Sequence, residues 1–277
     1  MWHHRFQARR IDRDALLAEK RREQGYVIIL PGIEGHSRWN RAICRGLVDA
    51  GVPYAIEIHD WTRGPLWYFW NLRDGRRHRE QAECIATKVA DYRLQYPERP
   101  VYLIGHSGGG AMTAFVLQQL PQGVRATGGI MLVSALSPWF RLHSALQHTE
   151  RGLWNYSAHG DLFFVGIGTT VFGTCDGRHS PAAGLVGFHP SALEDCDPAD
   201  SPPLRQMWFH WRMLRDFNLA GHLSCVNPRF VSNWIAPILL ADEGAEAAFG
   251  GATTPGVAAT ARCRIAESPP AERQPVR

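Results

Sequence analysis

The chain has 277 residues, of which 45% are hydrophobic and 20% charged, and this composition is typical of a globular protein with one large α/β domain or two small ones. Its formal net charge of +4 is mild, so it gives no indication of a nucleic-acid partner, and no stretch reaches the roughly 18 apolar residues that span a bilayer. Six scattered cysteines without C-x-x-C or zinc-type spacing predict free thiols, and residues 1–14 lack the apolar core of a secretory signal, so we expect a cytoplasmic protein.

Segments of two kinds alternate along the chain. A polar, charged stretch at residues 1–24 predicts an N-terminal arm, and the Ala, Gly, Thr and Pro composition of residues 242–277 predicts a disordered tail. Between them, β-type runs occur at residues 26–30, 54–58, 101–105, 128–135, 152–158 and 206–211, and helix-type runs at residues 39–49, 80–96, 111–117 and 231–240. Because strands alternate with helices, residues 25–241 predict one α/β domain with a mostly parallel sheet and helices on both faces.

The sequence GHSGG at residues 105–109 fits the G-x-S-x-G pattern and lies between a β-type run and a helix-type run. A serine in a sharp strand-to-helix turn has a strained backbone, and the residues two positions away lie too close for side chains. Gly105 and Gly109 leave that space, so the pattern predicts a nucleophile elbow with Ser107 Oγ exposed above the sheet. The competing interpretation is a Gly-rich turn that packs closely or binds phosphate, but the P-loop lysine and the GxGxxG spacing are both absent.

With this elbow on a parallel framework, the chain resembles the α/β-hydrolase superfamily over residues 26–240. The resemblance implies an α/β-hydrolase fold and a catalytic set in the chain order serine, acid, histidine. It places the acid after the second strand beyond the elbow strand, where Asp161 lies, and the base in the loop after the last strand, where Gly221-His222 fits. The short separation between Ser107 and Asp161 leaves no room for a large cap domain.

Other residues compete for both roles. Asp176 is an alternative acid in an Asp-Gly turn, and Asp60 is another at the end of an earlier strand. His210 is the main alternative base, although a histidine inside an apolar strand is more often a core residue. The remaining candidates are His106, His159 and His179.

An oxyanion hole requires two N–H donors. The resemblance implies that one is the amide of Gly108 and the other the amide of Ile33. The loop before Ile33 is similar to the H-G-x loop of the superfamily, with Pro31 in place of histidine. Trp67 and Trp70, in an aromatic stretch, either wall an acyl pocket or belong to a surface helix.

These residues predict a serine hydrolase, esterase- or lipase-like, that cleaves a small-molecule or lipid carboxylic ester or thioester through an acyl-serine intermediate. No metal, organic cofactor, nucleic-acid partner or integral membrane segment is expected. An acyltransferase with the same triad and a non-catalytic binding protein of the same fold remain alternatives, because a fold alone does not determine a function.

Overall fold

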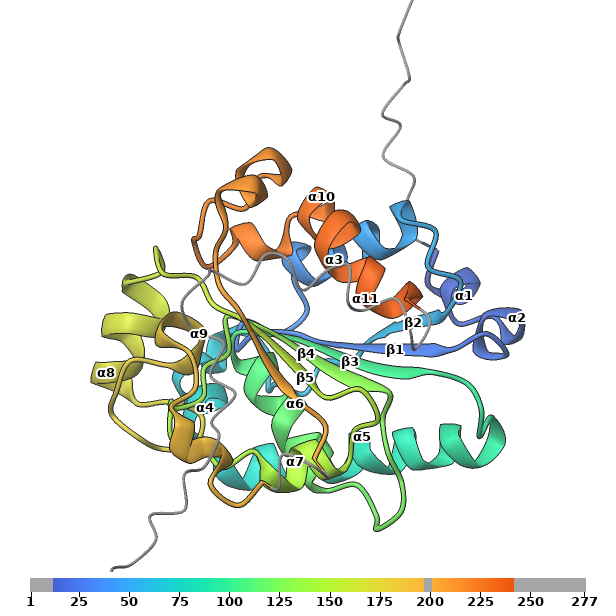
Figure 1. The fold of residues 1–277 in the computed structure, drawn as a ribbon, viewed down its shortest axis with the longest axis horizontal. Helices are drawn as coiled ribbons and strands as arrows, with labels where there is room; N and C mark the ends of the chain where they lie inside the picture. The colour runs from blue at the N-terminus through green and yellow to red at the C-terminus, as the bar shows by residue number, and fades with distance from the viewer. Residues whose placement is uncertain (1–11, 197–200, 242–277) are drawn as a thin grey trace, which may run out of the picture.

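A six-stranded, all-parallel sheet forms the centre of the molecule in the computed structural model, which describes residues 12–196 and 201–241. The spatial order of the strands is β2-β1-β3-β4-β5-β6 (Figure 1). The strands are β1 (Tyr26–Leu30), β2 (Ala55–Ile58), β3 (Val101–His106), β4 (Gly128–Leu132), β5 (Leu153–Tyr156) and β6 (Leu204–Met207). Because all strands are parallel, their carboxyl ends meet at one edge of the sheet, where ligands of α/β proteins bind.

Helices cover both faces of this sheet (Figure 1). One face carries α3 (Arg38–Asp49), α10 (Pro228–Phe230), a π-helical turn (Val231–Ile235) and α11 (Ala236–Leu240). The opposite face carries α5 (Gly75–Gln95), α6 (Gly108–Gln118) and α7 (His143–Gln147). The predicted fold class, a parallel sheet covered on both faces as in α/β-hydrolases, is therefore confirmed.

Strand β1 shows why the sequence reads as an unbroken apolar run. Its side chains alternate between the two faces, with Tyr26, Ile28 and Leu30 in the cluster that includes α5 and α6, and Val27 and Ile29 in the cluster that includes α3 and α11. All five are at most 1% exposed. A strand covered on both faces needs no polar position, which is the pattern of a central parallel strand.

The aromatic segment over residues 62–79 is partly helical. It contains a 3-10 turn (Pro65–Trp67), helix α4 (Tyr68–Arg73) and the start of α5, which begins earlier than the predicted residue 80. The early start has a local cause, because the Asp74 side chain accepts a hydrogen bond from the Arg77 backbone N–H at 3.0 Å and caps the helix.

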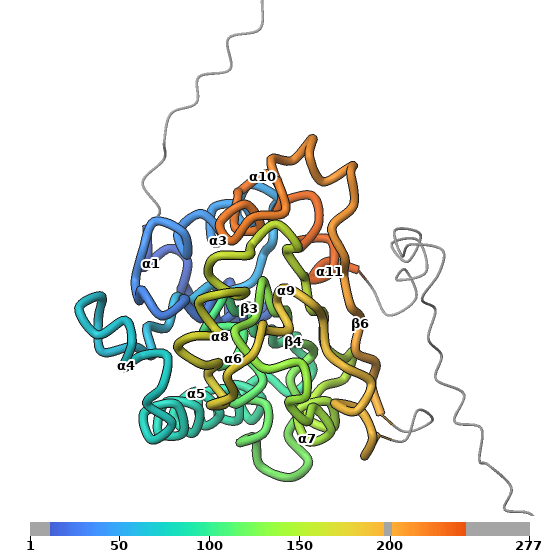
Figure 2. The backbone as a smooth tube through the Cα atoms, turned by 90° about the vertical axis from the view of Figure 1, so that its left-hand side faces the viewer, coloured from blue at the N-terminus to red at the C-terminus, as the bar shows by residue number. Residues whose placement is uncertain are grey.

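Short helices also interrupt the loop-like region after β5. They are a π-helical turn (Phe163–Gly168), α8 (Thr169–Phe172), α9 (Ala183–Val186) and a 3-10 turn (Pro190–Leu193). Gly173 and Gly187, with φ of 88° and 77°, end two of them in the left-handed region. Figure 1 shows α4, α8 and α9 at the end of the sheet opposite α2, and Figure 2 views the molecule from that end.

The last strand lies earlier than predicted. Strand β6 ends at Met207, so His210 is outside the sheet and caps a 3-10 helix (Trp211–Asp216), with its Nδ1 accepting from the Arg212 backbone N–H. The prediction of a strand over residues 206–211 is therefore wrong in position, and His210 is not a core strand residue. A further 3-10 turn (Ser224–Val226) precedes α10.

Before β1, residues 12–24 form α1 (Arg13–Leu16) and α2 (Glu19–Arg22). Arg21 ties α2 to the sheet edge, because its guanidinium donates to the carbonyl oxygens of Val52 (2.7 Å) and Tyr54 (2.9 Å). The remainder of the predicted arm, residues 1–11, and the predicted tail, residues 242–277, lie outside the described residues. In the described part of the chain, none of the helices has the length and apolar character needed to cross a membrane.

The close approach of Gly109 to β1 yields a stability prediction. A Cβ atom at Gly109 would lie 2.0 Å from the carbonyl oxygen of Leu30, whereas one at Gly75 would meet nothing within 4 Å. Since the obstructing atom is backbone, we expect Gly109→Ala to lower the free energy of unfolding by about 3 kcal/mol. Gly75→Ala, also in a first helical turn, should be neutral or slightly stabilising. Urea denaturation measures both, and equal stabilities would contradict this packing.

Candidate active site

Ser107 occupies a sharp turn between β3 and α6. Its φ of 56° and ψ of −117° are strained for a residue with a side chain. Backbone hydrogen bonds hold this conformation, since the Ser107 N–H donates to Leu132 O (2.9 Å) and the Ser107 carbonyl accepts from the Ala135 N–H (3.1 Å). The two glycines are sterically required, because a Cβ at Gly105 would lie 2.0 Å from Gly109 O. Ser107 thus lies in a strained strand-to-helix turn that has no room for a side chain at Gly105.

Asp161 and His222, which lie far apart in the sequence, are hydrogen-bonded. His222 Nδ1 donates to Asp161 Oδ2, and Asp161 Oδ1 accepts from the Phe164 backbone N–H at 3.1 Å. The Asp161 side chain is 2% exposed and that of His222 is 11% exposed. With Nδ1–H fixed by the carboxylate, the neutral His222 ring keeps the lone pair of Nε2 available as a base.

The Ser107 Oγ makes no hydrogen bond to any residue in the described chain, so Ser107 and His222 are not hydrogen-bonded to each other in this structure. Such catalytic hydrogen bonds are often long in free enzymes and tighten when substrate binds.

The backbone of His222 is held by two buried donors. Its carbonyl oxygen lies 2.9 Å from His106 Nε2 and 3.4 Å from Cys225 Sγ. Because a carbonyl only accepts, Nε2 of His106 carries the hydrogen. Burial lowers the pKa of His106 to about 3, so its ring stays neutral and adds no charge beside His222. Burial likewise raises the pKa of Cys225, which keeps the thiol protonated as a donor.

Phe164 contacts the proposed base directly. Its ring stacks on that of His222 with centroids 4.7 Å apart and an interplanar angle of 29°. Sequence analysis gave Phe164 no role, because it lies in a region that reads as loop. The only sequence signal is its position three residues after Asp161, in the helical turn that the Asp161 side chain caps.

The alternative acids and the main alternative base have other partners. Asp176 accepts from the backbone N–H (2.8 Å) and hydroxyl (2.5 Å) of Ser137, and Asp60 accepts from Thr62 and His36. His210 caps a helical turn, as described above. Of the remaining histidines, His159 stacks on Trp208 and His179 contacts Arg73. Within the described residues, His222 is the histidine whose ring is hydrogen-bonded to a candidate acid, since His36 bonds to Asp60 through its backbone N–H.

The two predicted oxyanion donors lie next to each other. A Cβ at Gly108 would be 2.8 Å from Cγ2 of Ile33 and 3.4 Å from its backbone nitrogen. Neither the Ile33 nor the Gly108 N–H has an acceptor among the described residues, so both are available to a ligand. Glu34 ties this loop to α3, since its carboxylate accepts from the Ser37 hydroxyl at 3.1 Å. Burial raises the pKa of Glu34.

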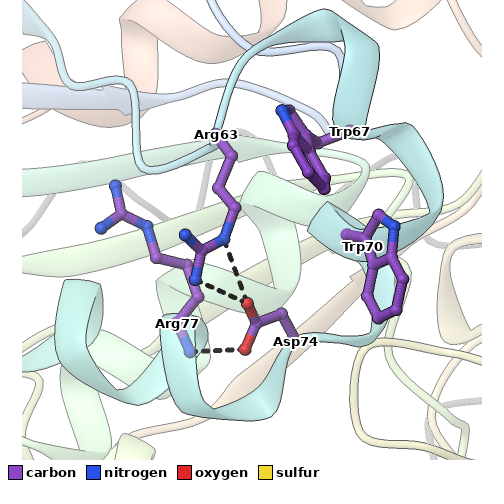
Figure 3. A pocket seen from close by; sticks show the side chains of 5 residues that line it. All are labelled: Arg63, Trp67, Trp70, Asp74 and Arg77. Carbon is purple, nitrogen blue, oxygen red and sulfur yellow. Dashed lines mark hydrogen bonds and ion pairs between the residues drawn. The ribbon is translucent and has the colours of Figure 1, made fainter.

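Trp67 and Trp70 line a neighbouring hollow. This cavity of about 610 Å³ is bordered by the two tryptophans, Arg63, Asp74 and Arg77, and its lining does not include Ser107, Asp161 or His222 (Figure 3). Arg63 Nη2 and the Arg77 backbone N–H both donate to Asp74, each at 3.0 Å. The predicted contact of the two tryptophans with an acyl group therefore stays a proposal.

Over residues 12–196 and 201–241, no group of three or more His, Cys, Asp or Glu side chains is arranged to hold a metal ion.

No protein-family model and no curated protein matches the chain. Among solved structures it is similar to a protein described as a hydrolase of the α/β superfamily from Xanthomonas campestris (16% identity, TM-score 0.46, covering 78% of this chain and 99% of that one). It is also similar to a cutinase-like protein from Cryptococcus sp. (15% identity, TM-score 0.40, covering 78% and 93%). A third is an extracellular α/β-hydrolase from a Paenibacillus species (14% identity, TM-score 0.36, covering 76% and 97%).

The buried, neutral His106 gives the protein a specific acid sensitivity. Its pKa falls from 6.5 to about 3 on folding, so between these values only the unfolded chain binds the proton. Stability is therefore lost as the pH falls below 6.5, by about 2 kcal/mol at pH 5 from this group alone. In urea denaturation at pH 7 and pH 5, His106→Gln should show a smaller loss than wild type, while the surface substitution His189→Gln should match wild type. An unchanged pH slope in His106→Gln would contradict the assignment.

Proposed function

We propose that this protein is a serine hydrolase that cleaves a carboxylic ester or thioester through an acyl-serine intermediate. The observation that carries the proposal is the hydrogen bond from His222 Nδ1 to the buried Asp161 carboxylate, at the same sheet edge as the strained Ser107. The sequence separates these three groups widely, and we propose that they act together as the catalytic set of an acyl-transfer enzyme. The neighbouring free amides of Ile33 and Gly108 add support.

The proposed reaction begins when His222 Nε2 takes the proton of Ser107 Oγ as this oxygen attacks the carbonyl carbon. Negative charge develops on the carbonyl oxygen and is stabilised by the N–H groups of Ile33 and Gly108. His222 then gives its proton to the departing alkoxide or thiolate, which leaves the acyl group on Ser107. Water deacylates the serine in the same way, since His222 takes its proton and returns it to Oγ. Asp161 stabilises the protonated ring throughout.

Exposed apolar side chains around the site support a substrate with an apolar acyl group. Leu162, Phe163 and Ile167 are each more than 60% exposed on the segment that carries Phe164. Helix α8 follows this turn directly and contacts α4, since the ring centroids of Phe172 and Phe69 lie 4.7 Å apart. We propose that the acyl chain lies against these residues, with Trp67 and Trp70 as further contacts.

An acyltransferase would use the same residues but pass the acyl group to an alcohol or amine. Product analysis separates the two activities, because hydrolysis releases the free acid and transfer yields a new ester or amide. A binding-only role is the third possibility, and it requires that Ser107 be unreactive.

Labelling with a fluorescent fluorophosphonate tests the proposed nucleophile. Wild type should be labelled at Ser107, located by peptide mapping, and Ser107→Ala should lose both labelling and roughly 10⁶-fold in kcat. Asp161→Asn should lose about 10⁴-fold in kcat, because the histidine tautomer is no longer fixed. The matched substitutions Asp176→Asn and His210→Gln should retain activity. Absence of labelling in folded wild type would favour the binding-only role.

The exposed side chains of Leu162, Phe163 and Ile167 predict that the rate of hydrolysis depends on acyl length. With monomeric p-nitrophenyl esters, kcat/KM should rise from acetate to hexanoate, by up to about fourfold for each buried CH₂ group. Phe163→Ala and Trp70→Ala should flatten this rise, whereas Leu94→Ala, an exposed position (85%) on α5, should not. A flat profile in wild type would contradict the proposed acyl contact.

A further inference from the structure

Two buried side chains hold the loop that carries Ile33. Trp61 Nε1–H donates to the Pro31 carbonyl oxygen at 2.8 Å, and Asn71 Nδ2–H donates to the Ile33 carbonyl oxygen at 2.9 Å. Trp61 is 0% and Asn71 1% exposed, so neither bond competes with bulk water. The loop is thereby fixed on both sides of one peptide unit.

That peptide unit is the one joining Gly32 to Ile33, and it carries the Ile33 N–H. The carbonyls bound by Trp61 and Asn71 belong to the two flanking peptide units. A peptide unit is planar, so reorienting one within a chain requires its neighbours to rotate in compensation. With both neighbours hydrogen-bonded, the central N–H has a fixed direction. We infer that Trp61 and Asn71 are positioning residues that orient the Ile33 N–H as an oxyanion donor.

The orientation of Asn71 is itself determined. Its Oδ1 accepts from the Arg63 backbone N–H at 3.0 Å, and its Nδ2 also donates to the Gly64 carbonyl at 3.0 Å. Exchanging the amide oxygen and nitrogen would place an N–H donor against the Arg63 N–H and an oxygen acceptor against the carbonyls of Ile33 and Gly64. The backbone carbonyl of Asn71 accepts from His78 Nε2 at 2.7 Å, which anchors the helix end that carries it.

Trp61 also touches the other oxyanion residue. A Cβ at Gly108 would lie 3.2 Å from Trp61 Cζ2, so the indole packs against the elbow while it bonds to the loop. Its ring is in turn packed edge-on against His78, with centroids 5.4 Å apart. Trp61 therefore fixes the position of the Ile33 loop relative to the turn at Ser107, and Asn71 fixes the direction of the Ile33 N–H. This inference rests on the proposed acyl-transfer function of Ser107.

The test uses Asn71→Asp, which keeps the acceptor for Arg63 but removes the donor to Ile33, and Trp61→Phe, which removes the indole N–H. Trp234→Phe is the matched control, because Trp234 Nε1 donates to Asp216 at 2.8 Å on the opposite face of the sheet. Three quantities are measured for each variant. They are the kinetics on a p-nitrophenyl ester, the Kd of an alkylboronic acid that forms a tetrahedral serine adduct, and the amide hydrogen exchange of residues 31–37.

We expect kcat to fall about tenfold or more in Asn71→Asp and Trp61→Phe, with KM changed less than twofold, because a misdirected donor acts on the transition state alone. The boronic acid should bind more weakly by a similar factor. The amides of Gly35 and His36, hydrogen-bonded in wild type, should exchange faster in both variants and normally in Trp234→Phe.

The two possible failures are distinguishable. Unchanged loop exchange in both variants would overturn the inference, whether or not the protein hydrolyses esters. Faster exchange with unchanged kcat in an active enzyme would also overturn it, since the loop would then not control the donor. If wild type is inactive and Ser107 unlabelled while exchange still rises, the proposed function fails and the loop-holding role of the two residues stands.

Discussion

The site depends on the close approach of α6 to the end of β1. A Cβ at Gly109 would lie 2.0 Å from Leu30 O and 2.5 Å from Pro31 O, so the two backbones touch without any intervening side chain. This contact places the elbow amide of Gly108 beside the loop amide of Ile33. The central position of β3, next to β1 in the sheet, therefore determines where both the proposed nucleophile and the two proposed oxyanion donors lie.

The two groups that hold the backbone carbonyl of His222 are dipoles rather than charges. Asp161 supplies the negative charge, while the two groups that hold the His222 carbonyl, the His106 ring and the Cys225 thiol, are kept neutral by burial. A second positive charge 4.8 Å away, at the distance between the His106 and His222 rings, would oppose protonation of the base in this poorly solvated region. The histidine of the GHSGG sequence thus provides a hydrogen-bond donor without a competing charge.

Local signals predicted much of this arrangement from the sequence. The apolar run before Ser107, the glycines around it and the strand spacing predicted the sharp turn and the sheet, whereas the resemblance to the α/β-hydrolase superfamily pointed to Asp161 and His222. The misplacement of β6 arose because its intermediate burial leaves no clear apolar run to mark its ends. Trp61 and Asn71 had no detectable signal, since each bonds to a carbonyl 30 or more residues away and such contacts follow no periodicity. Phe164 was missed because its π-helical turn has a Gly-containing, loop-like sequence.

Helix α4 connects the two halves of the proposed site. Asn71 bonds to the oxyanion loop, whereas the guanidinium of Arg73 donates to Phe172 O at 2.6 Å, in the segment that begins at Asp161. The outer face of α4 carries exposed aromatic rings, yet its inner face is fixed by the buried Asn71 and Leu72. Opening α4 as a lid would break the two Asn71 donor bonds, at a cost of about 0.5–1.5 kcal/mol for each. The exposed aromatic rings therefore lie on a helix that is held in place by hydrogen bonds. This favours a preformed binding surface on the same helix that holds the proposed oxyanion loop.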